Sequence, residues 1–192
     1  MFVAPRKQIR LPRDQYLGTK IYFVTICCED RRSIFLDANR AERAIEALKR
    51  ISDAMGFLVH AYCLMSDHVH VLAEAQSATS NFIKFVAQWK QSTGYLFRDE
   101  LPRRFWQRRF YDHILRRAEG SDSVAWYIWR NPVRKGIVAE ASQYPFSGSF
   151  TVEWPKNPQA NERWVPPWKE RDLHGDALKL APTLRKPRRG AL

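Results

Sequence analysis

The sequence has few cysteines, no long hydrophobic run and no glycine-rich phosphate loop. Its 192 residues include three cysteines, Cys27, Cys28 and Cys63. These form neither an even disulfide framework nor a CxxC metal knuckle, so we expect reduced thiols in a reducing cytoplasm. No stretch reaches the roughly 18 apolar residues of a membrane-spanning helix. The N-terminus also lacks the apolar core of a signal peptide, so we expect no membrane association and no export.

Acidic residues are also scarce relative to basic ones. The chain has 20 Asp and Glu against 32 Lys and Arg, a formal net charge of +12. Such a surplus repels itself and favours a polyanionic partner, above all a nucleic acid. A generally basic surface that serves only solubility is the alternative. Anionic membrane is a weaker option, because no basic amphipathic helix stands out.

Composition divides the chain into three parts. Residues 1–19 are polar and basic and are expected to form an arm. Residues 20–153 carry the hydrophobic patterning of a folded domain. Residues 154–192 hold six of the eleven prolines and end in a basic stretch, so we expect a partly disordered extension.

Hydrophobic periodicity predicts an α+β domain. Strands are expected at 20–28, 57–65 and 68–74, and helices at 38–55, from 79 or 80 to 96, and from 121 to about 131. This order begins a ferredoxin-like split βαβ sandwich, with helices on one face of an antiparallel sheet. A last strand is expected after residue 132, at Gly136–Ala141 or Gly148–Glu153.

Two of the five histidines, His68 and His70, are two residues apart on a predicted strand. This spacing directs both imidazoles to one face while Val69 and Val71 enter the core. Two neutral imidazoles can hold a cation and leave positions for water and a phosphate oxygen. A solvated pair of strand histidines is the alternative. His60 is expected to be a sheet histidine rather than a third ligand.

Tyr127 and Asn131 share a face of a predicted helix, because they are four residues apart. A phenol becomes a nucleophile when a metal-polarised phosphate and nearby arginines favour its ionisation. The Asn131 carbonyl oxygen is a candidate third metal ligand. A packing role for Tyr127 is the alternative, and Tyr95 and Tyr111 are competing candidates.

The segment 98–119 mixes arginines with aromatic residues and is expected to be a connector that contacts nucleic acid. Guanidinium groups bind phosphates, and aromatic rings stack on unpaired bases, a combination that suits single strands and hairpins. In the alternative, the aromatic residues are core anchors and the arginines a solvated face; we expect a mixture of the two. The candidate DNA-binding residues are Arg103, Arg104, Trp106, Arg108, Arg109, Tyr111, Arg116 and Arg117.

Three ordered motifs, MSDHVHVL, WQRRFYDHILR and YIWRNPVRKGIV, give the chain a family resemblance. From about Arg13 to Ser149 it resembles the REP-associated tyrosine transposases, relatives of the single-tyrosine HUH transposases. The resemblance implies a ferredoxin-like fold with His68 and His70 as the HUH metal ligands. It implies Tyr127 as the nucleophile and Asn131 as the residue that helps to hold the metal. It does not cover the extension after Glu153.

The resemblance also implies a reaction. Similar proteins use Mg²⁺ or Mn²⁺ to cleave single-stranded DNA near palindromic hairpins, leaving a 5′-phosphotyrosine and a free 3′-hydroxyl. Such relatives exist as monomers or homodimers. We therefore expect an enzyme that cleaves and rejoins single strands. A non-catalytic binder of structured DNA or RNA is the alternative, and a metal-dependent hydrolase would need a general base that the sequence does not identify.

Overall fold

The computed structural model describes residues 12–101, 104–116, 118–153 and 164. Two compact units divide the chain, Met1–Glu162 and Arg163–Leu192, and only Trp164 of the second is described. The expected arm up to residue 11 and nearly all of the expected extension therefore lie outside the described residues. Within those residues, no helix has the length and apolar character needed to cross a bilayer.

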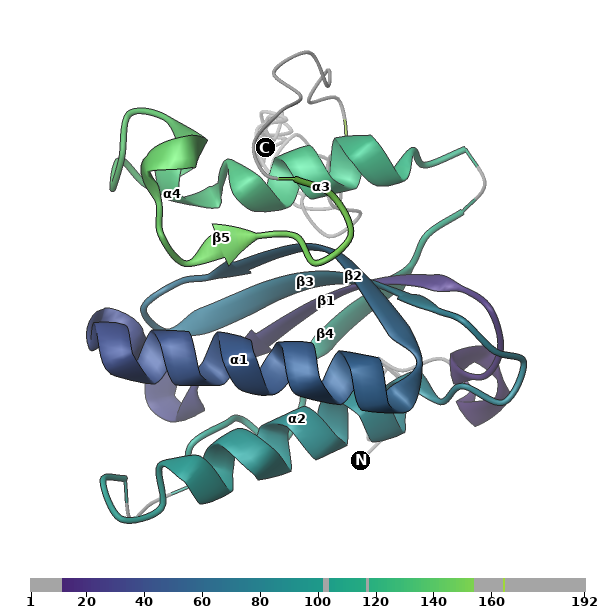
Figure 1. Cartoon of the computed structure of the whole chain (residues 1–192), viewed down its shortest axis with the longest axis horizontal. Coiled ribbons are helices and arrows are strands. Elements are labelled where there is room, and N and C mark those ends of the chain that lie inside the picture. Colours follow the sequence, from purple (N-terminus) through teal and green to yellow (C-terminus); the bar gives the residue numbers. More distant parts are fainter. Residues whose placement is uncertain (1–11, 102–103, 117, 154–163, 165–192) are drawn as a thin grey trace, which may run out of the picture. The chain divides into compact units, whose positions relative to one another are not determined.

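The described part of the first unit combines strands with helices (Figure 1). In chain order the elements are η1 (Arg13–Tyr16), β1 (Ile21–Cys27), η2 (Glu29–Arg31), η3 (Ile34–Leu36), α1 (Ala38–Met55), β2 (Phe57–Leu64), β3 (His68–Ala75), α2 (Phe82–Leu96), β4 (Tyr111–Ile114), α3 (Ser121–Trp129), α4 (Asn131–Arg134), η4 (Ala141–Gln143) and β5 (Ser147–Gly148).

The five strands form one sheet in the order β4-β1-β3-β2-β5, and every pairing is antiparallel. The four strands β1 to β4 and helices α1 and α2 make up the ferredoxin-like core. This confirms the predicted α+β fold class with its split βαβ arrangement. Strands β2 and β3 lie where the sequence predicts strands, and Ser66 and Asp67 lie in the tight turn between them.

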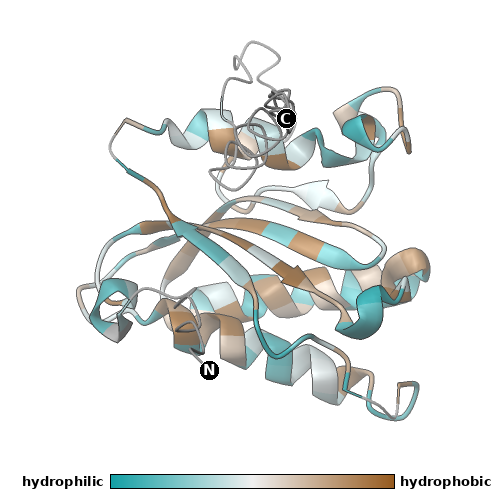
Figure 2. Ribbon diagram, turned by 180° about the vertical axis from the view of Figure 1, so that it is seen from behind, coloured by the Kyte–Doolittle hydropathy of each residue, from teal (hydrophilic) through white to brown (hydrophobic). Residues whose placement is uncertain are grey.

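Alternation along β1 explains how the sheet is buried. Tyr22, Val24 and Ile26 belong to the main hydrophobic core, together with residues of α1 and α2. The residue between the first two, Phe23, faces the opposite side and is also fully buried. Both faces of the central strands are therefore covered, as expected for strands that are apolar on both faces. Figure 2 shows hydrophobic residues along the strands and on the helices packed against them.

Two flanking residues determine the ends of α1. The Asp37 side chain accepts a hydrogen bond from the Arg40 backbone N–H, which satisfies a free donor of the first turn. Gly56 ends the helix in a left-handed conformation with φ 67°, which glycine adopts without a steric penalty.

The position of the last strands corrects the prediction. The strand that completes the ferredoxin-like sheet is β4, which lies inside the expected connector and pairs with β1. The second candidate range contributes only its first residue to β5, Ser147–Gly148, and 136–141 forms no strand. Pairing with the exposed edge of β1, rather than local hydrophobic alternation, makes 111–114 a strand.

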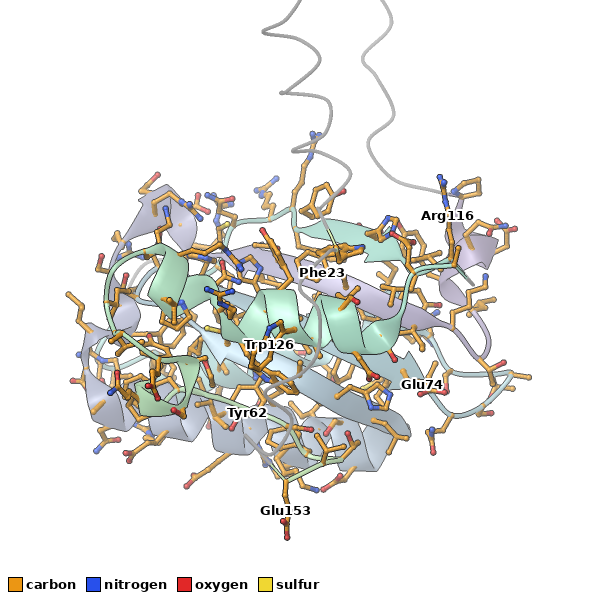
Figure 3. All side chains as sticks on the ribbon, turned by 90° about the horizontal axis from the view of Figure 1, so that it is seen from above. Phe23, Tyr62, Glu74, Arg116, Trp126 and Glu153 are labelled. Atoms are coloured by element: carbon orange, nitrogen blue, oxygen red, sulfur yellow. The ribbon has the colours of Figure 1, made fainter. Side chains whose placement is uncertain are left out.

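The expectation that all helices cover one face also needs correction. Helices α1 and α2 lie on one face, whereas α3 packs on the other, against β2 and β3 (Figure 1). Burial requires this third layer, since Phe23, His70 and Leu72 would otherwise leave that face of the sheet exposed to water. Figure 3 shows α3, which carries Trp126, lying across the strands on this side.

Candidate active site

The strand register places a row of side chains on the face beneath α3. Residues directly paired across antiparallel strands point to the same face. His70 of β3 pairs with Thr25 of β1, which pairs in turn with Tyr111 of β4. His68 pairs with Cys27 at the end of β1. The histidine pair and Tyr111 therefore share one face of the sheet.

His68 and His70 converge as predicted from their spacing. Their ring centroids are 4.8 Å apart, with the ring planes nearly perpendicular. Each ring is held at its Nδ1 atom: His70 Nδ1 lies 2.7 Å from Thr25 Oγ1, and His68 Nδ1 lies 2.5 Å from Asp67 Oδ1. These two oxygen atoms fix the orientation of each ring through its Nδ1 atom.

An arginine after β1 supports the bond between Asp67 and His68. Arg31 Nε lies 3.1 Å from Asp67 Oδ2, and Arg31 also donates to Cys27 Sγ at 2.9 Å. Burial lowers the pKa of His68, and the positive charges of Arg31 and Lys135 act in the same direction, although the Asp67 carboxylate opposes them. The net shift favours the neutral imidazole, which is the form that binds a metal ion.

Tyr127 lies on α3, above the histidine face. Its ring meets the ring of Phe23 edge-on at a centroid distance of 6.3 Å, and Phe23 stacks on His70 at 5.6 Å. The Arg134 guanidinium lies 4.0 Å from the centre of the tyrosine ring and donates to the Tyr127 carbonyl oxygen at 2.6 Å. The guanidinium and the tyrosine ring therefore form a cation–π contact.

Asn131 is buried one turn after Tyr127. Its amide nitrogen donates to the carbonyl oxygens of Tyr127 at 3.2 Å and Ile128 at 3.0 Å. These bonds use the nitrogen and leave the side-chain oxygen as the atom suited to a metal. The structure does not join Asn131 to either imidazole by a hydrogen bond, so its predicted role as a ligand stays a prediction.

The donor set fits a hard or borderline divalent ion that keeps open coordination positions. Metal-bound histidines typically donate their second ring N–H to a carboxylate or another oxygen, which fixes the ring orientation. Asp67 and Thr25 are such oxygen partners of His68 and His70. No group of three or more His, Cys, Asp and Glu side chains in the described part of the chain is arranged to hold a metal. A site here therefore needs an oxygen ligand of another kind, such as an amide, water or phosphate.

The arginine-rich segment matches the expected mixture of packed and exposed residues. Trp106 is 4% exposed, and its indole N–H donates to Thr93 Oγ1 at 2.8 Å, so this ring belongs to the core. Arg104, Arg108 and Arg109 are exposed on the same segment. Arg103 and Arg117 lie outside the described residues.

The other candidate tyrosines and His60 are in different settings. Tyr95 is 67% exposed on α2, on the face of the sheet away from the histidine pair. Tyr111 lies on the edge strand β4. His60 hydrogen-bonds Glu74 at 2.7 Å and Thr151 at 3.1 Å, as expected for a sheet histidine.

Four residues of the site were not assigned a role from sequence: Phe23, Thr25, Arg31 and Arg134. Phe23 and Thr25 are ordinary strand residues until the register with β3 is known. Arg31 contacts Asp67 from a loop after β1 that contains two left-handed residues, Asp30 with φ 55° and Arg31 with φ 54°. Arg134 lies on α4, after the break between α3 and α4 at Arg130, so helical spacing from Tyr127 did not identify it.

The family model described as "Transposase IS200 like" matches residues 18–131, which span the histidine pair, Tyr127 and Asn131. The chain belongs to this family. Two curated relatives of this IS200-like transposase support the resemblance. The REP-associated tyrosine transposase of Escherichia coli is 23% identical over 150 residues, 74% of this chain and 88% of the relative. A Haemophilus influenzae protein with the same family name is 26% identical over 161 residues. The match covers 72% of this chain and 89% of the relative.

A solved structure shares the fold of this IS200-like transposase. It is described as the REP-associated tyrosine transposase bound to a REP hairpin, and it superposes with a TM-score of 0.64 at 22% identity. The match covers 84% of this chain and 100% of the other. The predicted resemblance to REP-associated tyrosine transposases is confirmed by these comparisons together.

Proposed function

We propose that this transposase-family chain cleaves and rejoins single-stranded DNA near palindromic hairpins, with Tyr127 as its nucleophile. The observation that carries the proposal is the arrangement of the two imidazoles. Both are fixed at Nδ1, and Phe23 links their face to the ring of Tyr127. The relatives named for REP-associated transposition and the hairpin-bound structure support the choice of substrate.

His68, His70 and the Asn131 side-chain oxygen would hold Mg²⁺ or Mn²⁺. When bound, the ion polarises the scissile phosphate and neutralises its charge. Thr25 and Asp67 keep the imidazoles in the orientation that binding requires. Arg134 holds the Tyr127 ring by a cation–π contact, and the phenol proton passes to solvent as the oxygen attacks.

The Tyr127 oxygen then attacks phosphorus, and the bond from phosphorus to the 3′-oxygen breaks. A 5′-phosphotyrosine and a 3′-hydroxyl result, the latter after the departing oxygen takes up a proton. One phosphodiester replaces another, so the reverse attack by a 3′-hydroxyl rejoins strands without ATP.

The proposal is tested by separating cleavage from binding. His68→Ala and His70→Ala should abolish Mg²⁺- or Mn²⁺-dependent cleavage of a hairpin oligonucleotide. Both should retain most of the binding affinity, since arginines supply the phosphate contacts. His60→Ala is the matched control and should cleave like the wild type. If either variant of the pair cleaves at the wild-type rate, the metal role is wrong. Binding by the wild type without cleavage would favour a non-catalytic binder.

A further inference from the structure

Gly94 is an unexplained glycine within the last turns of α2. Glycine destabilises a helix interior relative to alanine. The backbone here does not adopt a left-handed conformation, and a Cβ atom added to Gly94 would meet nothing within 4 Å. Neither backbone strain nor crowding by the protein therefore requires glycine. Because Gly94 has no side chain, open space lies beside the helix at this position.

That space is part of a cavity of about 450 Å³ between α2 and the segment 104–108. Leu101, Phe105 and Trp106 give it an apolar lining. Binding sites for small molecules fall between roughly 300 and 1,000 Å³ and are mostly apolar with a few polar groups. The cavity is therefore large enough for one flat ring with its substituents.

Positive charge surrounds this apolar lining. Arg98, Arg104 and Arg108 all contribute to the walls of the cavity. Arg98 pairs with Asp99, and Arg104 pairs with Glu29, so these two charges are partly balanced. Arg108 is exposed and has no acidic partner in the described part of the chain. An apolar cavity beside an unbalanced guanidinium suits an aromatic ligand that carries an anionic group.

A chain of contacts runs from the histidine pair toward this cavity. At the end of β1, Cys27 pairs with His68 and the next residue, Cys28, forms a bridge with Trp106. The following loop continues the connection, since Arg31 binds Asp67 and Arg32 donates to the Arg104 carbonyl oxygen at 2.9 Å. The cavity lies on the α2 side of the sheet and the histidine pair on the α3 side, and the basic loop after β1 contacts both around this end of the sheet (Figure 1).

We propose that the cavity binds one unpaired nucleotide of the single strand that reaches the histidine pair. The base packs over Gly94 against the apolar lining, and a phosphate binds Arg108. Base contacts of this kind tolerate sequence variation, whereas the neighbouring guanidinium anchors the backbone. This inference rests on the proposed function only in taking its ligand from the same DNA strand.

Two matched pairs of variants test the cavity with a labelled single-stranded oligonucleotide containing 5-iododeoxyuridine. Gly94→Leu fills the open space and should weaken binding about tenfold, whereas Gly94→Ala should weaken it much less. Arg108→Ala should cause a similar loss of about tenfold. Arg109→Ala removes the same charge outside the cavity and should cost about twofold. Circular dichroism checks the fold of each variant.

Photocrosslinking identifies the place of binding. Mass spectrometry should find the nucleotide on the peptide that contains Phe105 and Trp106, and Gly94→Leu should remove this crosslink. Equal binding by the two Gly94 variants, or equal losses for Arg108→Ala and Arg109→Ala, would overturn the proposal.

Covalent adducts with Tyr127 are measured on the same samples. A wild-type crosslink that Gly94→Leu removes, found without any adduct, would support the cavity and contradict the proposed cleavage. Adducts with unchanged binding in Gly94→Leu and Arg108→Ala would contradict the cavity alone.

Discussion

Thr25 and His70 face each other across β1 and β3, with Thr25 Oγ1 2.7 Å from His70 Nδ1. The bond holds one ring nitrogen and directs the other away from β1. The threonine thus does for His70 what Asp67 does for His68. The two strands and the turn between β2 and β3 together determine how the imidazoles are presented.

Replacing Thr25 by valine should weaken metal binding while preserving the fold, because valine has the same shape and suits a strand. Loss of an outer hydrogen bond to a metal-binding histidine typically reduces metal affinity by about 10- to 100-fold. The measurement is the Mn²⁺ concentration that gives half-maximal cleavage. Thr25→Ser keeps the hydroxyl and should need little more Mn²⁺ than the wild type. The same half-maximal concentration for Thr25→Val would show that this bond does not position the ligand.

Asp67→Asn should raise the Mn²⁺ requirement by about tenfold, since it removes the carboxylate that holds His68 and pairs with Arg31. Asparagine also suits a tight turn, so the hairpin should form. Asp30→Asn removes a neighbouring carboxylate that is exposed and is the control. DNA affinity, measured without metal, should stay close to the wild-type value in both variants. A loss of DNA affinity with unchanged Mn²⁺ dependence would reassign Asp67 to the binding surface.

Much of the fold follows from local sequence signals. Strand β1 is apolar on both faces, α1 has helical spacing between a capping Asp37 and a terminating Gly56, and the histidine hairpin has a recognisable turn. In each case the residues that define the element lie within it or directly beside it in the sequence. The spacing of His68 and His70 likewise determines their shared face without knowledge of the rest of the molecule.

Features that depend on distant partners were not predictable in the same way. The sequence Tyr111–Ile114 is short and flanked by arginines, and it becomes a strand because it pairs with β1. Helix α3 covers the second sheet face because Phe23 and His70 need a partner layer. Side-chain bonds such as Thr25 to His70 require the register between two strands. Local periodicity contains none of this information.

Gly148→Ala should destabilise the protein, because β5 approaches β2 very closely. A Cβ atom at this position would lie 2.6 Å from Tyr62 Oη and 2.8 Å from Tyr62 Cζ. Overpacking of this kind costs about 1–3 kcal/mol in the free energy of unfolding. Urea denaturation measures the change.

Gly94→Ala is the matched control, because a Cβ atom there meets open space. This substitution should stabilise the helix by about 0.5–1 kcal/mol. Equal stability of Gly148→Ala and wild type would contradict this packing of β5.

The most direct test of the central claim compares wild-type protein with Tyr127→Phe for the formation of a covalent protein–DNA adduct. This substitution removes one oxygen and retains the ring beside Phe23 and Arg134. Wild-type protein is incubated with a hairpin oligonucleotide and Mn²⁺, and the adduct is mapped by mass spectrometry. We predict an adduct on the peptide containing Tyr127, lost in Tyr127→Phe with binding and fold retained. Tyr95→Phe and Tyr111→Phe should form it normally. An adduct on Tyr95 or Tyr111, or cleavage without an adduct on any tyrosine, would contradict the account.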